Sequence, residues 1–314
     1  MKRCNERGIA LLAALLVLAL LSIIILQFDA DARHALKGAA GFRDQLRATA
    51  LTDAGIQLAR AILQDDARTD MQRDEAFDSL GDSWATPVLH RQVGDATISI
   101  RIEDERAKLN VNELAYQLDP AAKRTKIERV RQLFSLVQVN PTLVDAIMDW
   151  VDGDDVAEPG GAESAYYLTA TPPYRTANSP LRAWSELLLI RGMSKEILHR
   201  LAPYITIFPI EGNGKVNMNT ADPLVIQSLD ANITPGLAIS VAGARPFRSL
   251  QEVDRVSGFE SIALRLRQAQ LYDVRSSYFT AWIDVALPGH SRHTRVVLRR
   301  EVSGDSMVID VAQL

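Results

Sequence analysis

The sequence contains a single cysteine, Cys4, among 314 residues, so no disulfide can form within the chain. A domain of this chain in an oxidising compartment therefore depends on packing or on a metal ion for its stability. The five histidines are spread along the chain, and their spacing predicts no metal-binding cluster. His290 and His293 follow Pro288-Gly289, and we expect them to lie in a hydrated turn.

The chain also lacks a strong excess of either charge. It has 35 Lys and Arg against 39 Asp and Glu, which gives a formal net charge of −4. No global basic field is present to attract nucleic acid. With 47% hydrophobic and 24% charged residues, the composition is that of a globular protein with room for two domains.

Residues 9–28 form an apolar run that no charged residue interrupts. About 20 helical residues, at ~1.5 Å each, span roughly 30 Å, the thickness of the hydrocarbon core of a bilayer. Basic residues precede the run and acidic residues follow it: Lys2, Arg3, Arg7, Asp29 and Asp31. This bias predicts a cytoplasmic N-terminus and sends everything after the run across the membrane.

A secretory signal peptide is the alternative interpretation of this run. Its apolar core would be only about 7–15 residues long and would end at a cleavage site of small residues. Here the run is longer, and apolar residues continue at helical spacing with no proline before Pro87. We therefore predict a transmembrane and stalk helix over residues 9–66, followed by a loop over the polar stretch 65–78.

Alternating apolar and polar residues predict strands on both sides of a helical middle region. Ile98, Ile100 and Ile102 alternate with polar residues, which gives one buried and one solvated face. The expected strands cover residues 88–93, 97–103, 278–287, 294–302 and 306–311. The sequence therefore predicts an α+β fold, in which one antiparallel sheet packs on the stalk and is interrupted by a large helical insert.

The insert contains an internal repeat. Segment 180–193 matches segment 246–259 without a gap, and segment 108–112 matches segment 215–219. Two copies of one helical unit are therefore expected. In each copy we expect a Glu in the first turn of a short helix, where the dipole favours a carboxylate, and a left-handed Gly that ends that helix. These residues are Glu186 and Gly192, and Glu252 and Gly258.

The second copy resembles helix-hairpin-helix DNA-binding modules, such as the competence DNA receptor, in segments 216–221 and 246–259. This resemblance implies duplex DNA as a partner. Such a hairpin should offer two glycines whose N–H groups face phosphate. The loop here, residues 234–237, has one glycine, and no Lys or Arg follows until Arg245. We expect no nucleic-acid partner, and a membrane-anchored DNA-binding protein remains an alternative function.

An acidic loop lies inside the first copy. Asp152, Asp154 and Glu163 stand at positions 1, 3 and 12 of an EF-hand-like spacing, although Ala157 replaces the glycine of an EF-hand. Crowded carboxylates without His or Cys suit Ca²⁺. We predict a structural Ca²⁺ site with three further contributing residues: Asp149, Asp155 and Asn178. The alternatives are a solvated loop that binds nothing and a pair of catalytic carboxylates, for which no substrate cleft is indicated.

The junction Arg7-Gly8-Ile9 resembles the prepilin peptidase site of type IV pilins and type II secretion pseudopilins. The resemblance implies cleavage between Gly8 and Ile9 on the cytoplasmic side of the membrane, and methylation of the new N-terminus. Most pilins carry Glu at the fifth mature position, where it contacts the N-terminal amine of the preceding subunit. This chain has Ala13 there, so we expect it to occupy the first position, with no subunit above it.

Several short motifs in a fixed order resemble the type II secretion minor pseudopilin K family, also called general secretion pathway protein K. They lie at residues 101–105, 108–112, 149–154, 161–167, 173–178 and 215–220. The resemblance implies a non-enzymatic subunit that caps the pseudopilus tip with minor pseudopilins I and J, and H below them, and supports export of folded proteins through the outer membrane. It also implies a Ca²⁺ site within the insert. A type IV pilus minor pilin is the alternative within the same architecture.

The expected organisation follows from these motifs. It places one transmembrane pass in the inner membrane, the N-terminus in the cytoplasm and the C-terminal domain in the periplasm. The expected segments are a prepilin leader, the transmembrane and stalk helix, the first part of a pilin-like sheet domain, the helical insert and the C-terminal strands. Their bounds are residues 1–8, 9–66, 67–107, 108–275 and 276–314.

Overall fold

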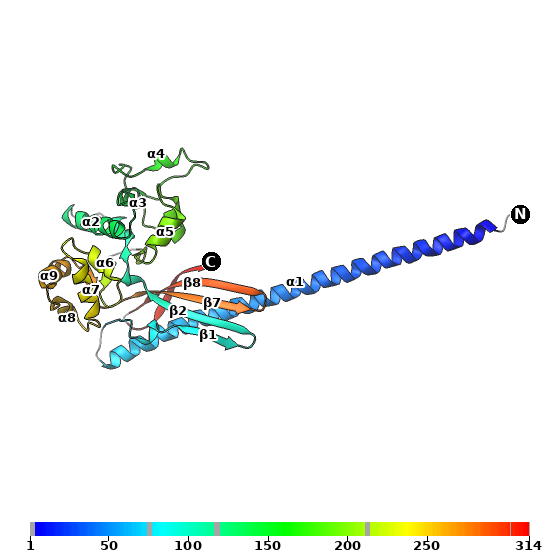
Figure 1. Ribbon diagram of the computed structural model, residues 1–314, viewed down its shortest axis with the longest axis horizontal. Coiled ribbons are helices and arrows are strands. Elements are labelled where there is room, and N and C mark those ends of the chain that lie inside the picture. Colours follow the sequence, from blue (N-terminus) through cyan, green and yellow to red (C-terminus); the bar gives the residue numbers. More distant parts are fainter. Residues whose placement is uncertain (1–3, 74–76, 116–119, 211–213, 302, 314) are drawn as a thin grey trace.

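The computed structural model describes residues 4–73, 77–115, 120–210, 214–301 and 303–313. Its longest element is α1 (Cys4–Arg73), which projects as a single rod from the rest of the molecule (Figure 1). An 18-residue window in α1 is long and apolar enough to cross a membrane, and none of it is buried within the protein. The absence of proline before Pro87 allows this helix to continue without a break.

The predicted end of this helix, at residue 66, was wrong. The stretch expected to be a loop is helical up to Arg73, and residues 74–76 lie outside the described part of the chain. The reason is tertiary: Leu63 and Ala67 are buried, and the buried carboxylate of Asp66 pairs with Arg300. These contacts keep a polar sequence in the helix.

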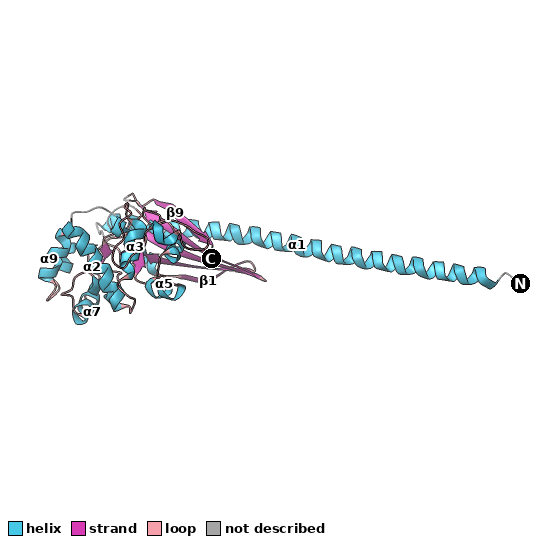
Figure 2. Ribbon diagram, turned by 90° about the horizontal axis from the view of Figure 1, so that it is seen from above, coloured by secondary structure: helices cyan, strands magenta, loops and turns pink. Residues whose placement is uncertain are grey.

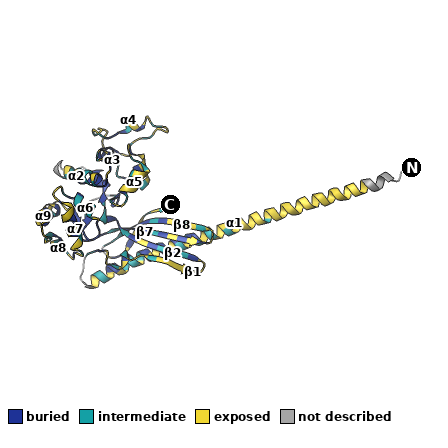
Figure 3. Ribbon diagram, viewed as in Figure 1, coloured by how far each residue is buried: buried dark blue, intermediate teal, exposed yellow. Residues whose placement is uncertain are grey.

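Five antiparallel strands form one sheet on α1, in the order β1-β2-β7-β8-β9. Their bounds are β1 (Val88–Val93), β2 (Ala96–Asp104), β7 (Tyr278–Leu287), β8 (His290–Arg300) and β9 (Ser306–Gln313). The alternation that predicted the strands is confirmed, because Ile98, Ile100 and Ile102 are buried and the residues between them are more exposed. This apolar face and residues of α1 form one core (Figure 3).

The hydrated turn predicted around His290 and His293 was also wrong. Pro288-Gly289 alone connects β7 to β8, since Leu287 already pairs with His290 and Gly289 adopts a φ of +82°. Proline fixes φ at about −65° at the first position of the turn, and glycine supplies the positive φ at the second, which is the pattern of a type II turn. Both histidines therefore belong to β8, where His293 Nδ1 lies 2.7 Å from Asp284 Oδ1.

The insert leaves the sheet after β2 and returns at β7, and its short elements surround a second, larger core. Figures 1 and 2 both show its helices beyond one end of the sheet, at the opposite end of the molecule from the N-terminus. Its elements are η2 (Glu105–Ala107), β3 (Leu109–Asn110), η3 (Val111–Ala115), α2 (Pro120–Leu136), α3 (Leu143–Val151), α4 (Ser164–Tyr167), η4 (Trp184–Leu189), α5 (Lys195–Leu201), β4 (Ile205–Thr206), β5 (Val216–Asn217), α6 (Pro223–Ser228), α7 (Pro235–Gly243), α8 (Leu250–Asp254), α9 (Glu260–Gln268) and β6 (Tyr272–Asp273). A short helix, η1 (Ser83–Ala85), precedes the sheet.

Two buried asparagines make equivalent bonds in the two halves of the insert. Asn112 Nδ2 donates to Leu181 O at 2.8 Å, and Leu181 N donates to Asn112 Oδ1 at 2.7 Å. Asn219 exchanges the same pair of bonds with Phe247, at 2.8 and 2.7 Å. Each asparagine side chain thus pairs both the N–H and the C=O of one residue that precedes a short helix. This pairing is needed because buried backbone groups must be hydrogen-bonded.

The glutamates and glycines of the two segments lie at matching places. Glu186 is in the first turn of η4, and Glu252 is in the first turn of α8. Gly192 and Gly258 have φ values of +83° and +82°, in the left-handed region as predicted. They do not cap these helices directly, because each helix ends earlier and each glycine lies in the following turn, where a type II turn needs a positive φ.

Candidate functional site

The acidic loop connects α3 to α4, at an extremity of the insert (Figure 1). Asp152 follows the last residue of α3, and Glu163 immediately precedes α4. One carboxylate oxygen from each of Asp152, Asp154 and Glu163 lies within 4.8 Å of the other two. The structure thus brings together the three residues that the EF-hand-like spacing selected.

Three oxygens at this loop are buried and have no hydrogen-bond partner among the described residues. They are Asp152 Oδ1, Glu163 Oε1 and Asn178 Oδ1. Buried polar atoms are paired in the great majority of cases, so an unpaired set indicates a missing partner. Oxygen atoms from carboxylates and an amide are the donors that Ca²⁺ prefers. The residues present therefore fit a bound Ca²⁺ ion.

The electrostatics of the loop indicate the same. Burial, and to a smaller extent the neighbouring Asp154 carboxylate, raise the pKa of Asp152 to about 6. Burial also raises the pKa of Glu163 to about 7, with an added contribution from Asp149. The cause is that ionised carboxylates lose water and repel one another. A divalent cation removes both penalties.

Asn178 holds the far side of the loop. Its amide Nδ2 donates to Asp155 Oδ1 at 3.1 Å and to Asp154 O at 3.3 Å, and its amide oxygen has no hydrogen-bond partner in the described part of the chain. Its φ of +44° is in the left-handed region, which asparagine tolerates better than most residues. Asp155 therefore orients Asn178, and both predicted contributors lie beside the three carboxylates.

Asp149 has a different position from the other predicted ligands. Its side chain is fully buried, and its Oδ1 accepts a hydrogen bond from Glu158 N at 3.0 Å. A methyl group on Gly161 would lie 2.0 Å from Asp149 Oδ2, so only glycine allows the loop to come this close. The side chain of Asp149 therefore positions the loop by binding a main-chain N–H group of the loop.

Sequence reasoning missed two residues that support the loop. Asp145 Oδ2 accepts a hydrogen bond from Gly160 N at 3.1 Å, and Arg191 Nη1 donates to Gly161 O at 2.8 Å. The spacing of Asp145 and Asp149 on α3, four residues apart, places both on one helix face and was a usable signal. Arg191 is distant in sequence and gave none.

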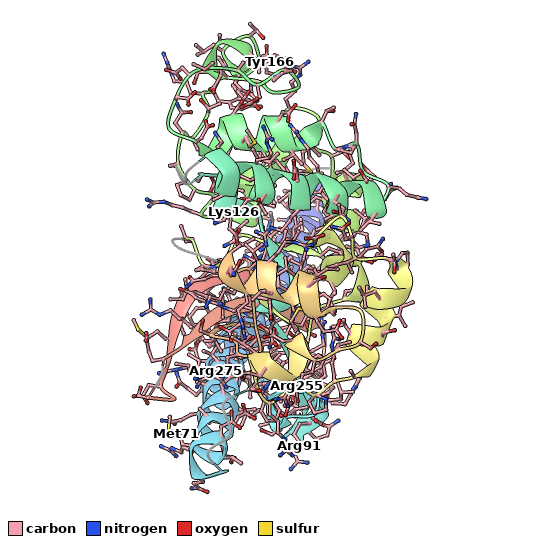
Figure 4. All side chains as sticks on the ribbon, turned by 90° about the vertical axis from the view of Figure 1, so that its left-hand side faces the viewer. Met71, Arg91, Lys126, Tyr166, Arg255 and Arg275 are labelled. Atoms are coloured by element: carbon pink, nitrogen blue, oxygen red, sulfur yellow. The ribbon has the colours of Figure 1, made fainter. Side chains whose placement is uncertain are left out.

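The helix that follows the loop, α4, carries an exposed side chain at an end of the molecule. Figure 4 shows Tyr166 at the opposite extremity from Met71, which lies near the end of α1. Tyr166 is about half exposed and stacks under the Arg191 guanidinium, 5.0 Å from the ring centroid. Beneath it, Tyr167 and Trp150 are buried edge to face, with centroids 5.3 Å apart. This aromatic packing holds together α3 and α4, the two helices that the loop connects.

The proposed processing site lies inside α1. Gly8 and Ile9 are both helical, and Ile9 is exposed. The candidate membrane span begins at Ile9, directly after Gly8. Arg245 is the first cation after the hairpin of the DNA-binding alternative. Arg245 Nη2 instead donates to Ala221 O, and burial lowers the pKa of this arginine to about 10.

Comparisons with known proteins agree with this architecture. Two models of the family Type II secretion system (T2SS), protein K, match residues 107–210 and 216–276. The chain is 30% identical over 307 residues to type II secretion system protein K of Aeromonas hydrophila, covering 90% of this chain and 89% of that one. It is 29% identical over 259 residues to the Pseudomonas aeruginosa protein K, covering 80% and 76%.

A solved structure shares the fold. It belongs to the GspK-GspI-GspJ complex of the enterotoxigenic Escherichia coli type 2 secretion system, with a TM-score of 0.76 and 18% identity over 88% of this chain and 99% of that chain. The long helix, the antiparallel sheet and the helical insert define an α+β pilin-like subunit. The chain belongs to the type II secretion system protein K family, a minor pseudopilin and structural component of the secretion machinery.

Proposed function

We propose that this subunit caps the tip of the type II secretion pseudopilus and thereby supports the export of folded proteins through the outer membrane. The observation that carries this proposal is the position of the insert at the opposite end of the molecule from the N-terminus (Figures 1 and 2). A further subunit stacked on that end would meet the insert. Ala13 adds support, because it offers no carboxylate to the N-terminal amine of a subunit above.

Minor pseudopilins I and J, with H below them, are the proposed neighbours. The solved complex of similar fold contains GspI and GspJ, which supports the first two. Site-specific photocrosslinkers in the full-length chain, co-expressed with the other pseudopilins, test the arrangement. Probes at exposed positions of α1 should capture I or J, whereas a probe at Tyr166 should capture no pseudopilin. Capture of a pseudopilin from Tyr166 would contradict the capping role.

Processing by prepilin peptidase belongs to the same proposal. Cleavage after Gly8, followed by methylation of the Ile9 amine, would leave the apolar window of α1 as a single pass in the inner membrane, with the sheet and insert in the periplasm. Intact-mass measurement of the chain from its native membrane should show loss of residues 1–8. A mature chain that starts near Asp29 would instead indicate a secretory signal peptide.

We further propose that Asp152, Asp154 and Glu163 hold a structural Ca²⁺ ion, together with the amide oxygen of Asn178. The unpaired buried oxygens at this loop support the proposal. The ion would supply a positive centre that fixes the loop, whereas Asp149 and Asp155 would position the loop and Asn178. A ligand that binds only the folded state stabilises it by about 2.7 kcal/mol at a hundredfold excess over Kd.

Thermal unfolding of the full-length chain in detergent, with Ca²⁺ or with EDTA, tests the ion. The midpoint should rise with Ca²⁺, and Asp154→Ala with Glu163→Ala should remove this rise. Glu158→Ala is the matched control, because it removes one charge from the same loop without removing one of the three clustered carboxylates. A double variant that keeps the full Ca²⁺ response would overturn the site.

A further inference from the structure

The edge strand β9 leaves part of the apolar face of the sheet uncovered. Val308 and Val311 pair with Leu298 and Val296, and these two partners are buried in the core between the sheet and α1. Directly paired residues of neighbouring strands point to the same face, so both valines continue the surface of that core. They are nevertheless 41% and 54% exposed, because no element in the described part of the chain covers them.

α1 forms a second wall beside this strand. Arg60 Nε donates to Ser306 O at 2.9 Å, and Gln64 Nε2 donates to Asp305 Oδ1 at 2.9 Å. These bonds show which side of α1 faces β9. Ile56 lies four residues before Arg60 and therefore on that side, where it is partly buried against the same core. An open angle thus lies between α1 and β9, with apolar side chains on both walls.

The same side of α1 continues towards the membrane-spanning run. Counted back from Ile56 in alternating steps of three and four residues, it carries Asp53, Thr49, Leu46 and Phe42. This is the spacing with which one helix presents a seam to another. Leu46 and Phe42 are large, apolar and more than half exposed. The apolar residues of this side and of the edge strand together are named the β9 flank: Phe42, Leu46, Ile56, Val308 and Val311.

The chain itself closes the opposite side of α1. Trp84, in the short helix η1 that precedes β1, is 1% exposed. Val88 of β1 and Leu51 of α1 are partly buried against the core between α1 and the sheet. Closer to the membrane-spanning run, Arg47 of α1 pairs with Asp95 in the turn between β1 and β2. Among the described elements, the open apolar angle therefore lies on the β9 side.

β1 is the other edge of the sheet, and Figure 2 shows it on the opposite side from β9. Its register shifts between Val88 and Arg91, and His90 has a φ of +50°. Irregular pairing and polar side chains are the usual protection of an edge strand. Leu89 and Val93 are exposed, but three polar residues separate them, so they form no continuous apolar surface.

The shape of the β9 flank selects a helix as its occupant. Strands lie about 4.8 Å apart, whereas helices pack about 8–10 Å apart, so a helix beside α1 would lie over β9 and its edge. A strand added to the edge of β9 is less suited, because the pairing with β8 shifts register between Val297 and Leu298 and an irregular edge interrupts a ladder. A neighbour anchored in the same membrane by its own apolar helix would run parallel to α1.

We propose that the β9 flank is the lateral docking site of this subunit and that its occupant is the stalk helix of one neighbouring pseudopilin, parallel to α1. The inference rests on the proposed assembly with other pseudopilins, and it adds the side of the chain on which the neighbour lies. The solved complex of similar fold, which contains GspI and GspJ, supports a pseudopilin as occupant. Asp53 interrupts the apolar side of α1, and we expect a Lys or Arg of the neighbour opposite it.

Photocrosslinkers at exposed positions of the full-length chain, co-expressed with the other pseudopilins, test the flank. Leu18, in the membrane-spanning run, reports assembly whichever side the neighbour takes. Val311 reports the β9 flank, and Leu89 is the matched control on the other edge of the sheet. Leu18 and Val311 should capture a pseudopilin, whereas Leu89 should capture none. Mass spectrometry should place the Val311 product in the stalk helix of the partner, just after its apolar run.

The contrary outcomes separate the inference from the function on which it rests. If Leu18 captures a pseudopilin and Val311 captures no more than Leu89, the β9 flank is overturned and the proposed assembly stands. If Leu18 captures none, the assembly is overturned, and the β9 flank with it. A Val311 product with a strand of the partner, or with a second copy of this chain, would overturn the stalk helix as occupant.

Val311→Glu gives a second readout. The side chain is exposed in the subunit alone, so the urea unfolding midpoint should not change, whereas docking would bury the new charge under an apolar helix. The amount of the other pseudopilins that co-purifies with the full-length chain in detergent should fall at least about tenfold. Leu89→Glu, which adds the same charge to the other edge, should retain the wild-type amount. Equal retention or equal loss in the two variants would overturn the β9 flank.

Discussion

Gly161→Ala is expected to destabilise the acidic loop. The added methyl carbon would lie 2.0 Å from Asp149 Oδ2, 2.6 Å from Asp149 Cγ and 3.0 Å from Asp145 O. The two contacts with Asp149 are too short to be tolerated, and Asp149 is fully buried, so its carboxylate cannot turn to solvent. Either Asp149 releases the amide of Glu158, now 3.0 Å from its Oδ1, or the loop moves away from α3.

The magnitude follows from the bond that is lost. A buried charged acceptor that loses a hydrogen-bond donor costs about 2–4 kcal/mol, at the upper end of the usual range for single substitutions. Urea unfolding of the full-length chain in detergent, followed by tryptophan fluorescence, measures this cost. Trp150 is a suitable local probe because it is buried in α3, next to Asp149.

Gly153→Ala provides the control in the same loop. A methyl group there meets no atom within 4 Å, and we expect a change within about 0.5 kcal/mol. If Gly161→Ala were as stable as Gly153→Ala, the close approach of the loop to Asp149 would be refuted. If Gly161→Ala also weakened the Ca²⁺ response, the positioning role of Asp149 would be supported.

Three other changes test the fold and the site. Asn219→Ala should cost about 2–4 kcal/mol in urea unfolding, because it leaves a buried N–H and a buried C=O of Phe247 unpaired. Gly55→Val should cost about 1–3 kcal/mol more than Gly38→Val in the same assay. The Cβ atom added at residue 55 would lie 2.8 Å from the side chain of Ile283 in the sheet, whereas a Cβ atom at residue 38 meets nothing within 4 Å. The rise in thermal midpoint caused by Ca²⁺ should be larger at pH 8 than at pH 5.5, because protons compete for Glu163, whose pKa is about 7.

A different result in each of these three experiments would contradict the prediction. Asn232→Ala, at an exposed asparagine, should leave the midpoint unchanged, and an equal loss in both asparagine variants would remove the argument from burial. Equal effects of the two valine substitutions would mean that α1 does not pack on the sheet at Gly55. A Ca²⁺ response independent of pH would mean that the raised carboxyl pKa values do not belong to the ion's ligands.

The sequence predicted those parts of the fold whose signals are local. The isoleucines of β2 alternate within one strand, and the carboxylates of the acidic loop follow a spacing that loop geometry imposes. The end of α1 was missed because the partner of Asp66 is Arg300, which lies in β8 and is far away in the sequence. No local pattern distinguishes a solvated aspartate from one that a distant guanidinium buries.

The way in which Asp149 and Arg191 support the loop was missed for a related reason. Asp149 was predicted to contribute to the ion, but its role in holding backbone amides depends on how closely Gly161 approaches α3. Arg191 reaches Gly161 O from the turn after η4, and its interaction appears only after the insert has folded. The residues that can bind an ion are recognisable from their chemistry. The residues that hold the loop in place are recognisable only once the folded chain brings them together.

The way in which the insert is attached to the sheet has a further consequence. Asp104, the last residue of β2, pairs directly with Phe279 near the start of β7, so the chain leaves and re-enters the sheet through neighbouring strands. Paired residues of antiparallel strands lie only about 5 Å apart. The insert therefore begins and ends at paired positions of neighbouring strands, so its length and internal fold do not set the register of β2 against β7.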